Sequence, residues 1–388
     1  MTASAIAPAA RVAIIGGGAI GLSIGWRLAQ AGCRVDVFDR GEAGRGASWA
    51  AAGMLAAGIE AETGEEALTA LNRRSQALWP GFAAELEAAS GAQVGLRGEG
   101  TLWVALTRDD AAQLRFQYEF QRGIGINLQW LSGTNARARE PHLHPHAPAA
   151  VFSPDDHQVD NRLLVQALAV AFTRAGGRLL EGRAVTGLDL TAGRVTGVRV
   201  GDTRVAAETV VLAAGAWAPE LPGLPEAARP PVRPVKGQML ALAMDPAAPL
   251  LRHVVWTQRA YLVPRLDGRL IVGATTEERG FDARLTAGGM LALLDGAWRT
   301  VPGVEELEIV ESWAGFRPGS RDDAPVLGPS GVDGLVLATG HHRNGILLTP
   351  ITADAVSRTV LTGATDPAIA DFGPARFASG RSGKAVSC

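Results

Sequence analysis

The segment between residues 11 and 39 constrains the fold of this chain more than any other. An apolar run at residues 12–15 meets Gly16-Gly17-Gly18-Ala19-Ile20-Gly21, and a second apolar run around Val37 ends at Asp39. This order of strand, glycine loop, helix, strand and acid is typical of the βαβ unit that binds a dinucleotide. A glycine-rich turn in an unrelated α/β protein is the alternative. The pattern does not distinguish FAD from NAD.

The residue types in this loop have physical reasons. Gly16 permits the tight turn after the strand, Gly18 lets the backbone approach a pyrophosphate, and Gly21 lets the helix pack against the strand. A helix predicted over residues 19–31 directs its free N–H groups and the positive end of its dipole toward that pyrophosphate. Asp39 has the position of the acid that accepts hydrogen bonds from ribose hydroxyls.

Composition narrows the class of protein. The chain has 388 residues, 47% of them hydrophobic, and a formal charge of −2, which suits two domains and provides no basic surface for nucleic acid or an anionic membrane. Its cysteines, Cys33 and Cys388, form neither a disulfide framework nor a metal-binding spacing. Residues 1–10 lack the basic start of a signal peptide, and no apolar run is long enough for a transmembrane helix. We therefore expect a cytoplasmic enzyme with a frayed N-terminus.

Residues 44–58 have mostly small side chains, with glycine or alanine at most positions. The lack of bulk predicts that a flat ligand lies against this backbone. Ser48 either caps a helix or forms a hydrogen bond to a phosphate. Close packing of a helix without a ligand is the alternative.

Hydrophobic periodicity and turn residues give the remaining elements. Predicted helices cover residues 19–31, 65–90, 109–123, 161–175, 286–300 and the stretch that ends at 361. Predicted strands cover residues 100–107, 126–131, 183–190, 194–200, 210–216, 238–243, 253–256, 261–264, 269–273, 308–316 and 335–339. A proline-rich link at residues 219–234 separates two runs of strands, so we expect the chain to leave and re-enter its first domain.

Two late stretches have the residues for chemistry. Arg317 stands at the end of a predicted strand, stiffened by Pro318, where its guanidinium could bind a carboxylate with two parallel hydrogen bonds. An ion pair of Arg317 with Asp322 or Asp323 is the alternative. In the second stretch, a strand leads into the polar glycine loop at residues 340–346 and then a helix, whose positive end could stabilise an electron-rich ring.

Together these motifs resemble the glycine oxidase family of the FAD-dependent D-amino-acid oxidase superfamily, over about residues 12–361. The matching segments are residues 16–21 with Asp39, 46–54, 211–217, 234–238, 261–265, 273–275, 313–319 and 340–348. The resemblance implies an α/β fold with an α+β substrate lobe. A Rossmann-like FAD-binding domain is interleaved with a mixed-sheet substrate domain, in the arrangement of para-hydroxybenzoate hydroxylase.

The expected domain limits follow from this arrangement. Residues 1–84, 148–222 and 318–375 form the FAD-binding domain, residues 85–147 and 223–317 form the substrate-binding domain, and residues 376–388 are a mobile tail. The resemblance also implies a homo-oligomer and non-covalent FAD. The sequence agrees on the second point, because no cysteine lies between Cys33 and Cys388 to attach the flavin.

By motif position, the resemblance makes Arg317 and Tyr261 catalytic and substrate-binding, with Arg343 and Met54 also at the substrate. The cofactor-binding positions are Gly16, Gly18, Ala19, Ile20, Gly21, Asp39, Arg40, Ala47, Ser48, Ala51, Ala52, Gly53, Met54, Val185, Ala214, Gly215, Trp217, Arg317, His342, Arg343, Asn344, Gly345, Ile346 and Leu347.

The implied reaction is oxidative deamination of glycine and small D-amino acids, and of sarcosine, to imino or oxo acid, ammonia and hydrogen peroxide. Hydride passes from the substrate Cα to flavin N5, without a dedicated acid or base, and dioxygen reoxidises the flavin. The product iminoacetate would serve the thiazole synthesis of thiamine, whose proteins are then partners. The alternatives are a quinone-linked D-amino-acid dehydrogenase of the same fold, an FAD-binding sensor or partner protein without turnover, and an NAD-dependent dehydrogenase.

Other residues keep two interpretations. Tyr261 could be a core residue, and Lys236 could support oxygen activation or be structural. His142, His144 and His146 alternate on a proline-broken loop, where a surface loop is favoured over a metal site and no metal is expected. His341 and His342 are interpreted as parts of the flavin loop rather than bases.

Overall fold

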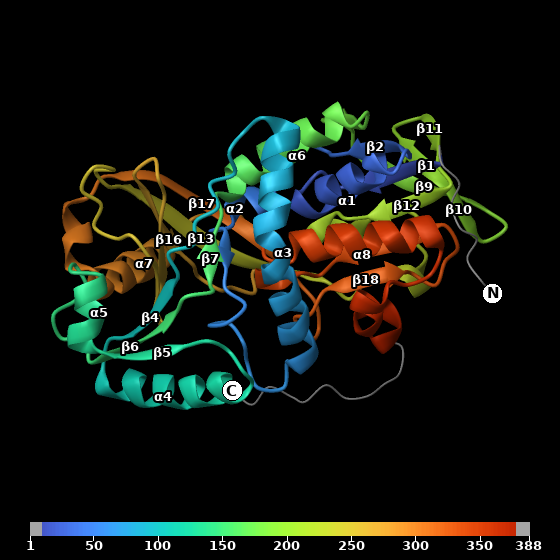
Figure 1. Ribbon diagram of the computed structural model, residues 1–388. Helices are drawn as coiled ribbons and strands as arrows, with labels where there is room; N and C mark the ends of the chain where they lie inside the picture. Colours follow the sequence, from blue (N-terminus) through green and yellow to red (C-terminus); the bar gives the residue numbers. More distant parts are fainter. Residues whose placement is uncertain (1–9, 378–388) are drawn as a thin grey trace.

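The computed structural model describes residues 10–377, which form two lobes, each built on one large sheet (Figure 1). A long helix, α3 (Glu66–Ser90), lies between the lobes in this view. The predictions for residues 1–9 and 378–388, a frayed start and a mobile tail, lie outside the described residues. Residues 376 and 377 belong to a short 3-10 helix, Pro374–Phe377.

The first lobe is built on a six-stranded sheet in the order β18-β19-β12-β1-β2-β8. Its strands are β1 (Arg11–Ile15), β2 (Arg34–Phe38), β8 (Arg178–Leu180), β12 (Thr209–Leu212), β18 (Val326–Pro329) and β19 (Leu335–Thr339). All neighbours are parallel except the β18–β19 pair at one edge. Since apolar residues fill these short strands, both faces of the sheet need a cover.

Helices cover one face and a small sheet covers the other. Helices α1 (Ala19–Gln30), α6 (Asn161–Arg174) and α8 (Thr349–Thr362) lie together with α3 on the same side (Figure 1). A three-stranded antiparallel sheet of β9 (Val185–Thr191), β10 (Arg194–Val200) and β11 (Thr203–Ala206) packs on the opposite face. The predicted Rossmann-like lobe is confirmed.

The second lobe is built on an eight-stranded mixed sheet in the order β17-β13-β16-β15-β14-β4-β6-β5. Its strands are β4 (Thr101–Ala105), β5 (Gln129–Ser132), β6 (Ala149–Ser153), β13 (Arg233–Ala243), β14 (Val254–Trp256), β15 (Tyr261–Pro264), β16 (Arg269–Gly273) and β17 (Ile309–Gly319). Only the β4–β14 pair is parallel. Helices α4 (Arg108–Gly123), α5 (Gly133–Arg139) and α7 (Ala287–Thr300) accompany this sheet, and α7 buries Leu293 and Ala297 in its core.

Short elements complete the chain. They are α2 (Ala47–Ala50), the paired strands β3 (Met54–Leu55) and β7 (His157–Gln158), and 3-10 helices at Gly215–Glu220, Glu226–Ala228, Pro302–Glu306, His342–Asn344 and Pro367–Phe372. None of the described helices combines the length and the apolar content that crossing a membrane requires.

Two differences from the predicted elements have local causes. The strand predicted at 210–216 ends at Leu212, because Gly215 has a φ of +55° and begins a 3-10 helix. The strand predicted from residue 238 begins earlier, at Arg233. Pro234 is tolerated there because this part of β13 pairs in register with β17 alone, where Pro234 lies opposite Pro318. Strands β3, β6, β7, β8, β11 and β18 were not predicted.

The predicted domain limits stay predictions. The pairing of β6 differs from the limit at residue 148, however, because β6 hydrogen-bonds to β4 and β5 in the substrate-side sheet.

Candidate active site

The glycine loop at the end of β1 has no room for side chains. Gly16 has a φ of +108°, and a Cβ there would lie 2.4 Å from the carbonyl oxygen of Ala213. A Cβ on Gly21 would lie 1.9 Å from the carbonyl oxygen of Gly16. The first glycine is therefore required by the turn and by β12, and Gly21 by the approach of α1 to the loop.

Asp39 and Ser48 fix this loop from two sides. The Asp39 carboxylate accepts hydrogen bonds from the backbone nitrogens of Gly17 and Gly41, each at 2.9 Å. The Ser48 hydroxyl oxygen accepts a hydrogen bond from the backbone nitrogen of Ala19 at 3.0 Å. Ser48 thus caps the first turn of α1 from a distant segment. The sequence analysis named helix capping as one role of Ser48, but it did not specify that α1 would be the helix.

A cavity of about 880 Å³ extends from this loop to the eight-stranded sheet. The predicted site residues that line it are Gly16, Gly18, Ala19, Ile20, Asp39, Arg40, Ala47, Ser48, Ala51, Ala52, Gly53, Met54, Val185, Ala214, Gly215, Trp217, Tyr261, Arg317, His342, Arg343, Gly345 and Ile346. Residues from several distant regions of the sequence therefore meet in one cavity.

Three predicted cofactor-binding residues do not line the cavity. Gly21 packs against the loop backbone behind it. Asn344 is buried, with its backbone bonded to His341 and Leu348. The Leu347 carbonyl accepts hydrogen bonds from Ser75 and Trp79 on α3. These three residues lie beside residues that line the cavity and contact the loop backbone or neighbouring helices instead.

The cavity fits a dinucleotide that ends in a flat ring. The N-terminus of α1 lies at the glycine loop, which suits a pyrophosphate. At Gly215, a Cβ would have no heavy atom within 4 Å, so space is open beside the backbone. Small residues of α2 and the segment after it line the cavity from the other side. These features match the shape and charge of FAD.

Arg317 projects from β17 into the cavity without an acidic partner. One terminal nitrogen of its guanidinium donates to the Thr275 carbonyl at 3.1 Å, and the group lies over Gly237, whose Cβ would come within 2.7 Å of it. Among the residues that the structure describes, no carboxylate lies within 4.0 Å of this guanidinium. The remaining donors are therefore available to a ligand carboxylate.

The alternative in which Arg317 pairs with a nearby aspartate is wrong. Asp322 accepts from Arg376 at 2.8 Å, and Asp323 lies 3.5 Å from Nδ1 of His342.

Tyr261 begins β15 on the same side of the cavity. Its ring lies over Gly273, where a Cβ would come within 2.5 Å of the phenol oxygen, and its hydroxyl donates weakly to the Met239 sulfur at 3.8 Å. Burial raises the pKa of the phenol, although the charge of Arg317 opposes that shift. Tyr261 therefore remains a neutral hydrogen-bond donor beside the guanidinium and is not a core residue alone.

A buried acid that the sequence analysis missed also lines the cavity. Burial raises the pKa of Glu60 to about 7, and the neighbouring Arg343 and Arg317 lower it only in part. Glu60 Oε2 lies 2.9 Å from Nε of Arg343. Arg343, predicted to bind substrate, also pairs with Glu62 at 2.9 Å and Glu65 at 3.5 Å, so acids of this chain occupy its guanidinium.

The two histidines of the late loop are unsuited to act as bases. Burial lowers the pKa of His341 to about 3, and its Nε2 lies 3.1 Å from the Thr352 hydroxyl. Burial and the nearby arginines lower the pKa of His342 to about 4. Both rings are neutral at physiological pH.

The contacts of Lys236 support the structural one of its two interpretations. The side chain is 1% exposed, and its Nζ donates to the Arg284 carbonyl at 2.6 Å and lies 3.5 Å from Glu277. It does not line the cavity, whereas its neighbour Gly237 does.

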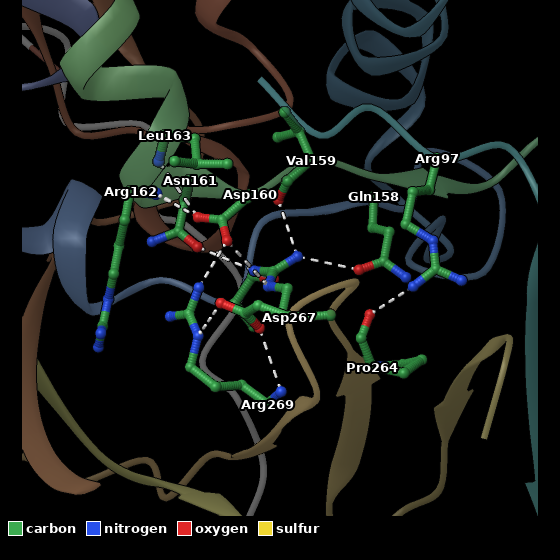
Figure 2. Close-up of polar contacts among 12 residues, drawn as sticks. Arg97, Gln158, Val159, Asp160, Asn161, Arg162, Leu163, Pro264, Asp267 and Arg269 are labelled. Carbon is green, nitrogen blue, oxygen red and sulfur yellow. Dashed lines mark hydrogen bonds and ion pairs between the residues drawn. The ribbon is translucent and has the colours of Figure 1, made fainter. Parts of the chain in front are cut away.

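A buried arginine joins the two lobes next to the cavity. Arg265, after β15, donates to Ala52, Gln158, Val159 and Asn161 at 2.7–3.0 Å. Asp160 accepts from Arg269 at 2.8 Å on the other side of the cluster (Figure 2). This cluster fixes the backbone of the segment before Met54 against the substrate-side sheet.

Sequence reasoning missed part of the cavity wall. The missed residues include Arg45, Glu60 and Met239, which line the cavity but lie outside the matching segments. Gly237, Gly273, Ala274, Gly315 and His341 lie within those segments, so the motifs carried a signal for them, and residues 256–260 also line the cavity. Elsewhere, among residues 10–377, no three His, Cys, Asp or Glu side chains gather as a metal would require.

The comparisons with known proteins agree with this geometry. A family model described as FAD dependent oxidoreductase (DAO) matches residues 11–359, so the chain belongs to that FAD-dependent family. The glycine oxidase of Geobacillus kaustophilus is 42% identical over 355 residues, which cover 89% of this chain and 93% of the relative. A crystal structure of glycine oxidase from that species has a TM-score of 0.86 at 39% identity, covering 94% of this chain and 98% of the other.

A second group of relatives is longer. The bifunctional protein ThiO/ThiG of Trichormus variabilis is 37% identical over 377 residues, and this chain spans 55% of its length. The fold class and the FAD dependence expected from the sequence are confirmed by the family and its solved structures.

Proposed function

We propose that this enzyme oxidises glycine and small D-amino acids, including sarcosine as a further substrate, to the imino acid, with release of hydrogen peroxide. The observation that carries the proposal is the pair of Arg317, which has donors left after its bond to the Thr275 carbonyl, and Tyr261, whose hydroxyl has only the weak Met239 acceptor, in the same cavity as the dinucleotide loop. The similarity to glycine oxidases along nearly the whole chain supports the choice of substrate.

The residues of this chain bind and orient the amino acid. Arg317 holds the substrate carboxylate by two parallel hydrogen bonds, and the neutral Tyr261 hydroxyl adds a third. Fixed by its carboxylate, the substrate presents Cα to the cofactor, so that positioning supplies much of the rate. FAD, when bound, supplies the two-electron oxidation, and dioxygen then receives the electrons. Water hydrolyses the released imino acid to the oxo acid and ammonia.

Several finer points belong to the same proposal. FAD is held non-covalently between the two predicted domains, in a cytoplasmic homo-oligomer. The imino acid from glycine serves thiazole synthesis for thiamine, as the relatives named ThiO/ThiG suggest. The substrate and dioxygen are the reacting partners, and proteins of the thiazole pathway are partners in use of the product.

The test is reduction of the purified yellow holoenzyme without oxygen. We expect glycine, sarcosine, D-alanine and D-proline to bleach the flavin absorbance, and L-alanine to leave it unchanged. Admission of oxygen should restore the colour and form one hydrogen peroxide per substrate.

Three other outcomes would overturn the proposal. Bleaching with slow reoxidation by oxygen but fast reoxidation by a quinone would indicate the dehydrogenase. A yellow protein that no amino acid bleaches would indicate the FAD-binding sensor. Bleaching by L-alanine alone would exclude the proposed substrates.

A further inference from the structure

Glu60 is an acid in the wall of the cavity that the proposed mechanism does not use. Its side chain is 7% exposed, and it lines the cavity with Tyr261 and Arg317. The Oε2 atom is buried and accepts no well-aligned hydrogen bond from the described residues, although it lies 2.9 Å from Nε of Arg343 in an ion pair. A buried carboxylate oxygen without a well-aligned donor is costly, so a further hydrogen-bond donor would stabilise it.

More acidic than basic groups surround Glu60. Arg343 is its nearest cation, but Glu62 and Glu65 also pair with Arg343. Asp156 and Glu62 repel the charge of Glu60, whereas the more distant Arg317 attracts it. This corner of the cavity therefore favours a cation, while the Arg317 side favours an anion.

An amino acid in water near neutral pH has both of these charges. Its carboxylate suits Arg317, and its ammonium group is left for the other side of the cavity. A carbon next to an ammonium group is a poor hydride donor, because nitrogen then has no free electron pair to stabilise the imine. The ammonium group must therefore lose one proton within the complex or before it forms.

We propose that Glu60 binds the ammonium group of the substrate and removes its excess proton. In this step an N–H bond breaks, the electron pair stays on nitrogen, and the proton forms an O–H bond with Glu60. Glu60 later returns the proton to water, so no oxidant is involved. The inference rests on the proposed function and adds a base to it, where the sequence analysis expected none.

The pKa of Glu60 suits the removal of a proton near neutral pH. Burial and neighbouring acids raise the pKa of Glu60 to about 7, so the carboxylate is ionised in much of the free enzyme and still basic enough to accept a proton. The groups facing it are Arg343, Arg317, Asp156, Glu62 and the phenol of Tyr261.

The test compares Glu60→Gln with Glu62→Gln. Glu62 also pairs with Arg343, but its side chain is 56% exposed. Flavin reduction by glycine is measured without oxygen from pH 6 to 10. We expect Glu60→Gln to lower the reduction rate about 100-fold at pH 7, with recovery at high pH where free glycine loses its own proton. Glu62→Gln should keep most of the wild-type rate at pH 7, with its pH profile shifted to lower pH because one acid that repels Glu60 is gone.

Binding of acetate, followed by the flavin spectrum, provides a readout that does not depend on turnover. Acetate has a carboxylate but no amine, so Glu60→Gln should bind it as well as or better than the wild type. In the wild type, acetate binding should weaken as the pH rises through about 7 and Glu60 gains charge.

Two results with Glu60→Gln would overturn the inference. One is an unchanged pH profile in Glu60→Gln, and the other is an equal loss of acetate and glycine binding, which a merely structural acid would give. If Glu60→Gln does not retain FAD, the wild-type acetate titration decides, because a flat titration excludes the role. Failure of the wild type to be reduced by glycine or D-amino acids would instead reject the proposed function.

Discussion

At the scale of single residues, Arg317 has the largest predicted effect. Its guanidinium has one carbonyl partner and no acid within reach among the described residues, so a bound carboxylate would complete its hydrogen bonds. We expect Arg317→Ala to weaken substrate binding by about 3–5 kcal/mol, the cost of removing one partner of a desolvated ion pair. FAD should remain bound, as judged by the absorbance spectrum after gel filtration.

A neighbouring arginine provides the control for this change. Arg321 is exposed in the turn after β17, so Arg321→Ala should retain wild-type affinity in the same anaerobic titration. Normal affinity in Arg317→Ala would show that the carboxylate binds elsewhere.

Tyr261 makes a smaller contribution of the same kind. Because burial keeps its phenol protonated, it donates one neutral hydrogen bond, and Tyr261→Phe should raise KM by about 1 kcal/mol, or roughly fivefold. The control is Tyr118→Phe, since Tyr118 packs on Trp130 outside the cavity. Equal effects of the two changes on steady-state KM would argue against a substrate contact of Tyr261.

At the scale of elements, two helical glycines differ in the space around them. A Cβ at Gly21 in α1 would lie 1.9 Å from the Gly16 carbonyl oxygen, whereas a Cβ at Gly81 in α3 would meet nothing within 4 Å. We expect Gly21→Ala to destabilise the protein by about 1–3 kcal/mol through overpacking and to lower the FAD content. Gly81→Ala should stabilise it by up to about 1 kcal/mol through helix propensity.

Thermal unfolding and the ratio of flavin to protein absorbance measure both changes. Stabilisation by Gly21→Ala would mean that the helix can move away from the loop without cost, and that the glycine is not required by packing.

The sequence predicted best those elements whose own residues show a clear pattern. The βαβ unit has apolar periodicity and a glycine loop, and the observed α1 (Ala19–Gln30) is one residue shorter than predicted. Arg317 and Tyr261 were found through motifs at strand ends. Glu60 was not, because nothing local distinguishes it from the exposed acids nearby, and only the folding of its segment against Arg343 buries it.

Pairing between distant segments was equally hidden. The capping of α1 by Ser48 and the side-chain position of Arg343 depend on contacts across the chain. The motif order placed both residues near the cofactor but did not show which groups they contact. Local sequence thus predicts which segments form the cavity, while the orientation of polar groups needs the tertiary structure.

At the scale of the whole molecule, the site depends on how the two lobes are held together. Arg265 is buried where the lobes meet, and burial lowers its pKa to about 10, which leaves it charged at neutral pH. Its four acceptors are Ala52 after α2, Gln158 and Val159 before α6, and Asn161 at the start of α6, the last three of which Figure 2 labels. Small side chains in residues 47–53 therefore face the cavity in a fixed position, and the stability of the interface and the shape of the site are coupled.

The pH dependence of global stability follows from the buried histidines. The pKa of His341 is about 3 in the folded chain and 6.5 when unperturbed, so the unfolded chain binds the extra proton first as the pH falls. The contribution of the neutral His341 ring to the free energy of unfolding is fully present above pH 6.5. It is lost as the pH falls toward 3, at about 1.4 kcal/mol per pH unit. His342 adds to this loss, whereas Glu60, whose pKa is raised, offsets part of it between pH 7 and 4.5.

Replacing His341 separates its contribution from the others. Between pH 7 and 5, urea unfolding should show a loss of stability that is smaller by about 2 kcal/mol in His341→Asn than in the wild type. His142→Asn, on an exposed loop, should show the full wild-type loss. An equal loss in all three proteins would mean that the ring of His341 is already protonated in the folded state, in which case its buried contact with Thr352 would have to be reassigned to an imidazolium donor.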